Sequence, residues 1–362
     1  MKGLYVHLPF CKNRCAYCGF YSETESFDLQ SDYFRALVSD LRSRDKRRYE
    51  TLYVGGGTPS SVDRKMLAAF LDIISVLNIG WYKETTIEAN PESIDDEFCE
   101  LLSTYKFTRT SIGCQSTSDD VLAKLTRIHN AKDVFCSVEL VKKTAPETDI
   151  NLDLIYDIPD VDYSVTLQSM KDIISLEPDH ISAYTYSNDN NFIHEREDDT
   201  DFMRVKDFLE DAGYIKYEIS NFAKPGHESK HNINYWKLGD YDGIGASAWS
   251  LENNNDKRTL KGKTSDIKNY IKTPTSFCEV QTAESPDTII ESIVFGLRMT
   301  EGIDIENKCS TIDEKLKRKI YNCLEKLVEK ELLEWNGSRV CLSRQGELLL
   351  DSVQLSLWEQ LT

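Results

Sequence analysis

The sequence predicts an α/β fold, with a barrel or partial barrel of six βα units followed by a smaller, mainly helical domain. Short apolar runs alternate with longer segments of helical apolar spacing, and recognisable polar motifs follow the runs. Such alternation indicates parallel βαβ units, in which active-site residues gather at the carboxyl ends of the strands. A change of pattern after residue 258 indicates the second domain.

Six apolar runs of strand length define the predicted sheet. They cover residues 4–8, 51–54, 85–88, 109–112, 150–155 and 180–184. The segments between them repeat apolar residues at helical spacing, as Tyr33, Leu37 and Leu41 do after the first run. Six units of this kind suit a partial (β/α)6 barrel.

A polar stretch at residues 252–266 has no strong periodicity, and we expect a domain boundary there, between residues 1–258 and 259–362. Residues 312–330 are predicted to be helical, and 332–342 to form a hairpin around Asn336 and Gly337, a favoured tight-turn pair. A last helix is expected over 344–360. Helix, hairpin and helix resemble a winged-helix layout. We expect this module to cover the barrel or to bind a protein.

Composition limits the environment and the partners of the chain. Its net charge of −18, from 43 basic and 61 acidic residues, argues against a nucleic-acid substrate, which calls for a basic surface. No apolar run approaches the length of a membrane span, and the amino terminus has no signal-peptide features. Ten cysteines without an export signal indicate a reducing compartment, so we expect a cytoplasmic protein.

Three cysteines near the amino terminus supply three thiolates from one loop. Cys11, Cys15 and Cys18 have the spacing C-x3-C-x2-C. A [4Fe–4S] cluster usually takes four cysteine ligands, so three would leave one iron open. The amino and carboxylate groups of S-adenosylmethionine (SAM) could chelate that iron, and the cluster could then break the sulfonium C–S bond. The alternatives are a zinc site completed by a ligand such as His7, or three unrelated thiols.

Further polar motifs follow the predicted strands. The run 55–59, Gly-Gly-Gly-Thr-Pro, is either a tight turn or a cradle for the methionyl end of SAM, because glycine lets backbone amides approach a ligand. Glu88 could accept hydrogen bonds from ribose or amino groups, and Asn90 with Pro91 could cap a helix. Asp153, in an apolar strand, needs a partner, and a structural ion pair with Arg127 is the alternative to a ligand role.

Residues 231–236 combine a metal-capable side chain with two large aromatic ones. His231 could be an axial ligand to haem iron, with Tyr235 or Trp236 stacking on the ring. The alternative is that His231 is only packed among the aromatic residues.

These motifs resemble the radical SAM superfamily, in particular the branch around the oxygen-independent coproporphyrinogen III dehydrogenases. The similar segments are 5–11, 55–59, 88–91, 111–116, 153–159 and 180–184. Within this branch the chain resembles the haem chaperones. The dehydrogenases have a fourth cysteine where this chain has Phe20, and a long segment before the cluster. Segments 217–222, 231–236 and 296–298 resemble the chaperone group, with 231–236 matching its HNxxYW motif.

The resemblance implies a set of ligand contacts and partners. SAM would contact Tyr5, Tyr17, Gly56, Gly57, Thr58, Glu88, Gln115, Arg127 and Asp153, with Tyr17 against the adenine. His231 would take part in haem handling. The implied partners are haem, recipient apo-haemoproteins and an electron donor, with membrane association only through them. Gly19 and Asp157 depart from the residues common in the group.

Three functions therefore compete. The first is a haem chaperone that binds a [4Fe–4S] cluster, SAM and haem, and passes haem to apo-haemoproteins. The second is a coproporphyrinogen III dehydrogenase that forms protoporphyrinogen IX by oxidative decarboxylation. The third is an anaerobic radical SAM enzyme acting on an unrelated small molecule. Phe20 and the 231–236 motif favour the first over the second.

Overall fold

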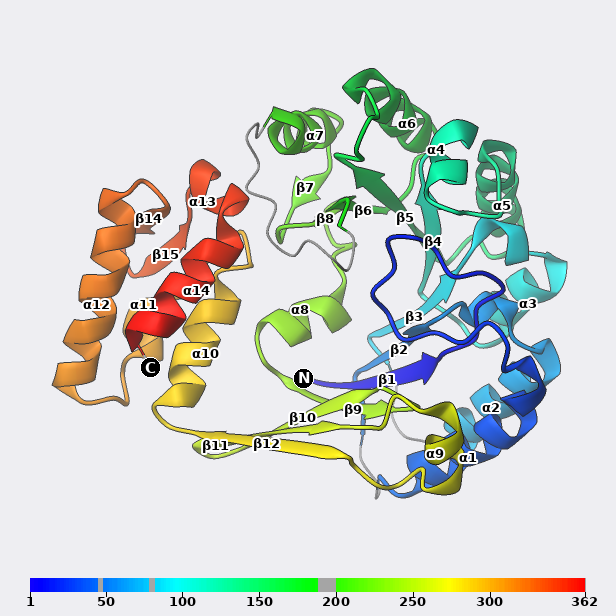
Figure 1. Ribbon diagram of the computed structural model, residues 1–362, viewed down its shortest axis with the longest axis horizontal. Coiled ribbons are helices and arrows are strands. Elements are labelled where there is room, and N and C mark those ends of the chain that lie inside the picture. Colours follow the sequence, from blue (N-terminus) through cyan, green and yellow to red (C-terminus); the bar gives the residue numbers. More distant parts are fainter. Residues whose placement is uncertain (45–47, 78–81, 188–199, 362) are drawn as a thin grey trace.

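The computed structural model describes residues 1–44, 48–77, 82–187 and 200–361. Within them, the main sheet has twelve strands in the order β12-β11-β10-β9-β1-β2-β3-β4-β5-β6-β8-β7. The sheet curves into an open arc without closing, as Figure 1 shows. It is a partial barrel, as predicted.

Six neighbouring strands of this sheet run parallel and follow one another in chain order. They are β1 (Lys2–Leu8), β2 (Thr51–Gly56), β3 (Glu84–Ala89), β4 (Arg109–Gln115), β5 (Asp149–Tyr156) and β6 (His180–Thr185). All six predicted strands are confirmed. Because consecutive parallel strands are neighbours, their carboxyl ends form one edge, which collects the loops that follow them.

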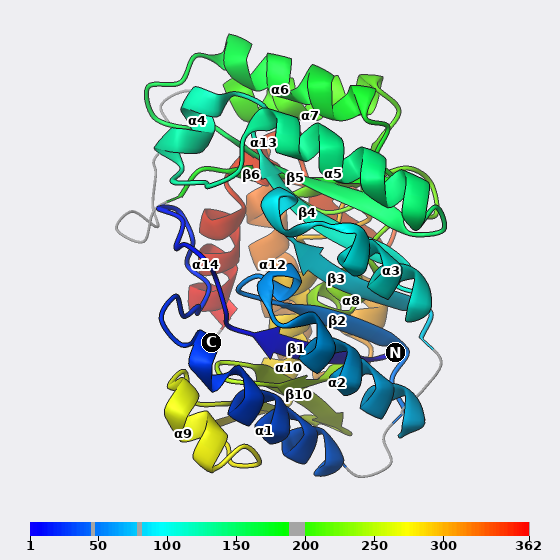
Figure 2. The same ribbon diagram turned by 90° about the vertical axis from the view of Figure 1, so that its right-hand side faces the viewer.

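Helices pack on the outer, convex side of the arc (Figures 1 and 2). They include α1 (Gln30–Arg42), α2 (Arg64–Val76), α3 (Asp96–Thr104), α5 (Ala131–Thr144), α6 (Tyr163–Ser175) and, at the far end, α7 (Thr200–Asp211); the short α4 (Asp119–Lys124) precedes α5. Local sequence sets their starts. Asn130 and Asp133 form a reciprocal capping box at α5, for example. Apolar helix faces and strands share one core, which includes the buried Leu37, Phe70 and Leu102.

Residues 252–266, where the sequence predicts the domain boundary, have regular secondary structure. This stretch lies mostly in a hairpin of β10 (Trp249–Asn254) and β11 (Lys257–Gly262), which extends the main sheet beyond β9 (Asp240–Ile244). The hairpin tip is exposed, so polar residues hide the alternation that a half-buried strand normally has. After α9 (Ile267–Lys272), β12 (Glu279–Glu284) pairs with β11. We therefore propose that the domains divide between Glu284 and Ile290, where the second core begins.

The carboxyl-terminal domain has its own core and the predicted helix–hairpin–helix order. Its elements are α10 (Asp287–Gly296), β13 (Ile303–Asp304), α11 (Ile305–Lys308), α12 (Glu314–Glu329), β14 (Leu333–Asn336), β15 (Arg339–Leu342), α13 (Arg344–Leu348) and α14 (Leu350–Leu361). Gly337 turns the hairpin with φ +63°, a conformation that favours glycine. The predicted last helix is divided into α13 and α14. Among the described residues, no helix is long and apolar enough to cross a membrane.

A short helix lies inside the arc, between the sheet and the carboxyl-terminal domain. It is α8 (Lys230–Trp236), which follows the short strands β7 (Ile215–Lys216) and β8 (Asn221–Ala223). Figure 1 shows α8 on the concave side of β1 to β3. The segment matching HNxxYW therefore lies where the two domains face each other.

Candidate functional site

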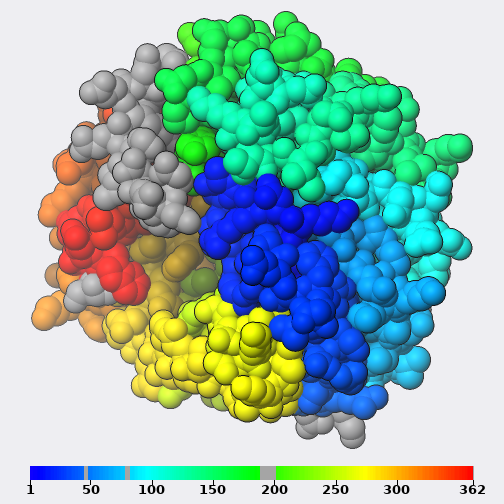
Figure 3. Space-filling model, turned by 45° about the vertical axis from the view of Figure 1, so that its right-hand side comes forward, coloured from blue at the N-terminus to red at the C-terminus, as the bar shows by residue number. Residues whose placement is uncertain are grey.

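The cysteine loop follows β1 at the carboxyl edge of the parallel strands. Its two ends are tied together, since the backbone N–H of Cys11 donates to the carbonyl oxygen of Glu23 at 3.0 Å. The Asn13 amide donates to the Thr126 carbonyl oxygen at 2.6 Å, which fixes the loop on the segment after α4. The three cysteines are free and half-buried. Figure 3 shows this amino-terminal segment, in blue, at the surface beside a hollow.

Two of the three sulfur atoms belong to one chain of hydrogen bonds. Sγ of Cys11 lies 3.4 Å from Oγ1 of Thr58, which accepts from Nδ2 of Asn90 at 3.1 Å. Arg127 completes the chain, because it donates to Oδ1 of Asn90 at 2.7 Å and to Sγ of Cys15 at 3.4 Å. Residues that follow three different strands thus meet at the cysteine loop.

Asn90 has a different role from the one predicted. Its side chain makes no capping hydrogen bond at the short helix Pro91–Ser93, and instead joins Thr58 to Arg127. The link between Thr58 and Arg127 could not be predicted from the sequence, because an Asn before a Pro is typical of a helix start.

The three thiols and His7 do not form a compact tetrahedral site for zinc among the described residues. Zn–S bonds of about 2.3 Å bring four tetrahedral sulfur ligands within about 4 Å of one another. Among the described residues, the three thiols do not form a group whose ligand atoms all lie within 4.8 Å. His7, the candidate fourth zinc ligand, has both ring nitrogens engaged: Nδ1 with the Tyr5 hydroxyl and Nε2 with the Tyr21 carbonyl oxygen, each at 3.0 Å. The structure therefore gives no support to a zinc site completed by His7.

The glycine run at residues 55–57 lets the end of β2 pack closely against the backbone that leads into the cysteine loop. The N–H of Gly57 donates to the Leu8 carbonyl oxygen and that of Thr58 to the Phe10 carbonyl oxygen, both at 2.8 Å. A Cβ on Gly57 would lie 2.7 Å from the carbonyl carbon of Pro9, and Gly56 has φ +116°. These amides thus hold the end of β2 against the chain leading into the cysteine loop. Contact of Gly56, Gly57 and Thr58 with SAM stays a prediction.

Two carboxyl groups line the concave face near the carboxyl edge. Glu88 accepts from the Tyr53 hydroxyl at 2.8 Å and from the Gly56 N–H at 3.0 Å, and burial raises its pKa to about 7. Asp153 accepts from Nδ2 of Asn151 at 2.8 Å, and burial raises its pKa to about 6. Both can accept hydrogen bonds from hydroxyl or amino groups of a ligand.

The raised pKa of Glu88 predicts a pH dependence of stability. Between about pH 4.5 and pH 7 the native apoprotein binds more protons than the unfolded chain, so its free energy of unfolding should fall as pH rises. Each pKa unit is worth roughly 1.4 kcal/mol. Glu88→Gln should flatten this decline and stabilise the apoprotein at pH 8, as urea unfolding between pH 5 and 8 would measure. An unchanged pH profile in the variant would contradict the assignment to Glu88.

The other predicted SAM residues lie on the same edge or beside it. Gln115 has φ +69° and lies at an irregularity in the pairing of β4 with β5. Its side chain and that of Arg127 both pack against Gly113: Nε2 of Gln115 and Nη2 of Arg127 would each lie 3.1 Å from a Cβ added to this glycine. Non-glycine residues in this conformation often mark functional sites. Tyr17 packs against the apolar cluster that includes Leu125 and Ile158.

His231 is packed in this structure, the alternative that the sequence left open. The residue is 1% exposed, and burial lowers its pKa to about 3. Nδ1 lies 2.8 Å from Oγ1 of Thr51 and Nε2 lies 2.8 Å from the Tyr235 hydroxyl. A metal would need one of these nitrogens, so ligation requires that a hydrogen bond be broken.

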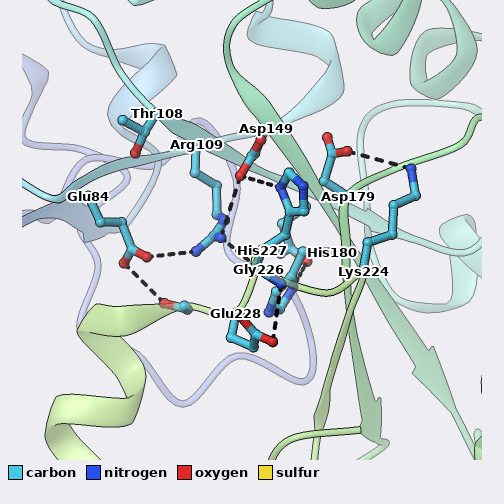
Figure 4. A network of polar contacts seen from close by, with 12 residues as sticks. Glu84, Thr108, Arg109, Asp149, Asp179, His180, Lys224, Gly226, His227 and Glu228 are labelled. Atoms are coloured by element: carbon cyan, nitrogen blue, oxygen red, sulfur yellow. Dashed lines mark hydrogen bonds and ion pairs between the residues drawn. The ribbon is translucent and has the colours of Figure 1, made fainter. Parts of the chain in front are cut away.

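A buried ionic network fixes α8 to the sheet. The Glu84 carboxylate accepts from the backbone N–H groups of Lys230 and His231 at 2.8 and 3.0 Å, and from Nη1 of Arg109 at 3.2 Å. Arg109 also donates to the His227 carbonyl oxygen at 2.6 Å, as Figure 4 illustrates. Glu84 and Arg109 are the first residues of β3 and β4, at the edge of the sheet opposite the cysteine loop.

The same view contains a group of possible metal ligands. Ligand atoms of Asp149, Asp179 and His227 lie within 4.8 Å of one another. Arg109 lies 3.8 Å from Asp149 and Lys224 lies 3.5 Å from Asp179 (Figure 4). Because cations already neutralise both carboxylates, this group is a structural ionic network.

The three segments that resemble the chaperone group meet at the domain junction. Nε of Arg298 donates to Glu218 at 2.6 Å, and Nη2 donates to Oγ of Ser220 at 3.2 Å. The guanidinium lies 4.2 Å from the centre of the Trp236 ring, a cation–π contact. Segments 217–222, 231–236 and 296–298 thus join α8 to the carboxyl-terminal domain.

Comparisons with known proteins agree with this architecture. Residues 5–172 match the model of the radical SAM superfamily, and residues 284–349 match that of the HemN C-terminal domain. The chain is 30% identical to the heme chaperone HemW of Bacillus subtilis (strain 168), over 98% of both chains. It is 33% identical to the heme chaperone HemW of Escherichia coli (strain K12), over 71% of this chain and 72% of that one.

A solved structure has the same fold. The coproporphyrinogen III oxidase HemN from Escherichia coli aligns with a TM-score of 0.82 and 20% identity, covering 98% of this chain and 89% of that one. At this identity the likeness concerns the fold alone. The sequence similarity along the whole chain goes further, and the chain belongs to the HemW family of the radical SAM superfamily.

Proposed function

We propose that this protein is a haem chaperone that binds a [4Fe–4S] cluster, SAM and haem, and transfers haem to apo-haemoproteins. The observation that carries the proposal is the similarity over 98% of both chains to a heme chaperone HemW. A similarity of that extent spans both the cysteine loop and α8. An electron donor would be a further partner, and we expect no nucleic acid among the ligands because the net charge is −18.

Membership of the radical SAM superfamily implies the cluster and SAM. Cys11, Cys15 and Cys18 would hold the cluster, which when bound supplies one electron to the sulfonium of SAM. Arg127 places a positive charge beside the sulfur of Cys15. Glu88 and Asp153 would orient amino or ribose groups, and Tyr17 would lie against the adenine.

Haem would bind at the junction that contains α8 and the carboxyl-terminal domain. Trp236 and Tyr235 offer aromatic surface there, and both are partly exposed. Phe20 stands where the dehydrogenases have a fourth cysteine, and its side chain is 71% exposed. This residue favours the chaperone over a coproporphyrinogen III dehydrogenase. The solved structure of the same fold is named a coproporphyrinogen III oxidase.

Two measurements on the anaerobically reconstituted protein test the proposal. We expect haem to bind with a defined Soret band and to pass to an apo-haemoprotein, and we expect no decarboxylation of coproporphyrinogen III. Steady formation of protoporphyrinogen IX would contradict the chaperone function and show that the protein is a dehydrogenase. Absence of both haem binding and decarboxylation would contradict both the chaperone and the dehydrogenase function.

A Tyr235→Phe variant tests His231 as the haem ligand. Loss of the hydroxyl removes the hydrogen bond to Nε2 of His231, which is 2.8 Å long in the structure. Since one such bond is worth about 1 kcal/mol, haem affinity should rise about fivefold if Nε2 binds the iron. Haem titration followed by the Soret band measures the change. Equal Soret spectra and affinities in Tyr235→Phe, His231→Ala and the wild type would exclude His231 as a ligand.

A further inference from the structure

The guanidinium of Arg127 is held on several sides. Besides its contact with Cys15, Nη2 donates to Oδ1 of Asn90 at 2.7 Å and to the Gly113 carbonyl oxygen at 2.8 Å. A further contact joins Nε of Arg127 to Nδ1 of His129 at 3.4 Å. Because the guanidinium is a rigid plane, an acceptor at Nε fixes the direction in which its two other nitrogens point.

His129 faces Arg127 with a lone pair. Its side chain is 0% exposed, and its Nε2 lies 3.1 Å from the carbonyl oxygen of Cys114. A carbonyl oxygen only accepts, so Nε2 carries a proton. Nε of Arg127 only donates, so Nδ1 is the acceptor in that contact. The backbone of β4 therefore fixes the tautomer that Arg127 needs.

Glu92 adds a negative charge to the same arrangement. Its Oε2 lies 3.5 Å from Nδ1 of His129, and among the described residues no hydrogen bond reaches this buried oxygen. With the proton on Nε2, the ring offers this oxygen no donor. The carboxylate then acts through space, by favouring a cation at the position of Arg127.

We propose that His129 is a positioning residue that turns Arg127 toward the sulfur of Cys15 and thereby sets both the reduction potential of the cluster and the affinity for SAM. The inference rests on the proposed cluster and SAM sites. Hydrogen bonds and charge next to the ligand sulfurs tune the potential of iron–sulfur clusters, and residues that orient a ligating group commonly change affinity by 10–100-fold.

A matched pair of variants separates positioning from packing. His129→Asn keeps an acceptor near the position of Nδ1, whereas His129→Gln keeps a donor near that of Nε2 and loses the acceptor for Arg127. We expect the Gln variant to bind SAM about tenfold more weakly. We also expect its reduction potential to fall, because the cation no longer points at the sulfur of Cys15. The Asn variant should stay close to the wild type in both.

Three readouts are measured on reconstituted protein: the midpoint potential by redox titration, SAM affinity from the change in the electron paramagnetic resonance spectrum, and the unfolding temperature. Equal losses in both variants, with equal drops in unfolding temperature, would make His129 a packing residue and overturn the inference. Wild-type values in the Gln variant would overturn it as well.

A double-mutant cycle tests whether His129 acts through Arg127. Arg127→Gln should lower SAM affinity and potential by itself, and adding His129→Gln should change neither further. Additive losses would overturn the inference. A wild type that holds the cluster but gives no spectral response to SAM would instead refute the SAM site of the proposed function, while the potentials would still decide the role of His129. A wild type without a cluster would refute both.

Discussion

A Cys15→Ala variant is expected to lose the [4Fe–4S] cluster. The loop offers three thiols, and Cys15 is also the one that accepts a hydrogen bond from Arg127, at 3.4 Å. With two protein ligands left, two irons of the cube would have no ligand from the protein. Iron and sulfide counting after anaerobic reconstitution, together with electron paramagnetic resonance of the reduced protein, should give about four irons for the wild type and almost none for the variant.

Cys136→Ala is the matched control. Cys136 is an exposed free cysteine on α5, away from the cysteine loop, and its loss should leave the iron content unchanged. A full cluster in the Cys15→Ala protein would contradict the assignment of the three ligands. Loss of iron in both variants would mean that reconstitution depends on thiols in general.

The fold could be predicted where buried residues form a regular apolar pattern along the sequence. Strands such as β2 and β5 are buried on both faces and stand out as apolar runs, so all six were found. The hairpin of β10 and β11 was missed because its exposed end holds polar residues, among them Asn253, Asn254 and Asn255. The strand period is not visible in such a stretch.

The site was predictable to the extent that parallel strands bring their carboxyl ends together. Glu88, Gln115 and Asp153 follow this rule and lie on neighbouring strands. The roles of Asn90 and His129 could not be predicted from the sequence. Asn90 contacts Thr58, which is far along the chain, and the tautomer of His129 depends on the carbonyl oxygen of Cys114. Nor could the sequence predict that both ring nitrogens of His231 form hydrogen bonds within the protein.

The largest expected loss of stability comes from Glu84→Ala. The Glu84 and Arg109 side chains are each 5% exposed and lie 3.2 Å apart, so the change leaves a buried guanidinium without its main partner. Removing one member of a buried pair commonly costs about 3–5 kcal/mol. The change also removes the acceptor from the N–H groups of Lys230 and His231. Urea unfolding should report the loss, and the amides of α8 should exchange faster with deuterium.

Lys83→Ala, one residue away, provides the comparison. Lys83 is 64% exposed and pairs with Glu50 at the surface, where an ion pair contributes no more than about 1 kcal/mol. A Glu84→Ala variant no less stable than Lys83→Ala would show that the buried network does not fix α8. If Glu84→Ala also weakens haem binding while Lys83→Ala does not, the geometry of α8 matters for the ligand, because neither change touches the aromatic residues 235 and 236 directly.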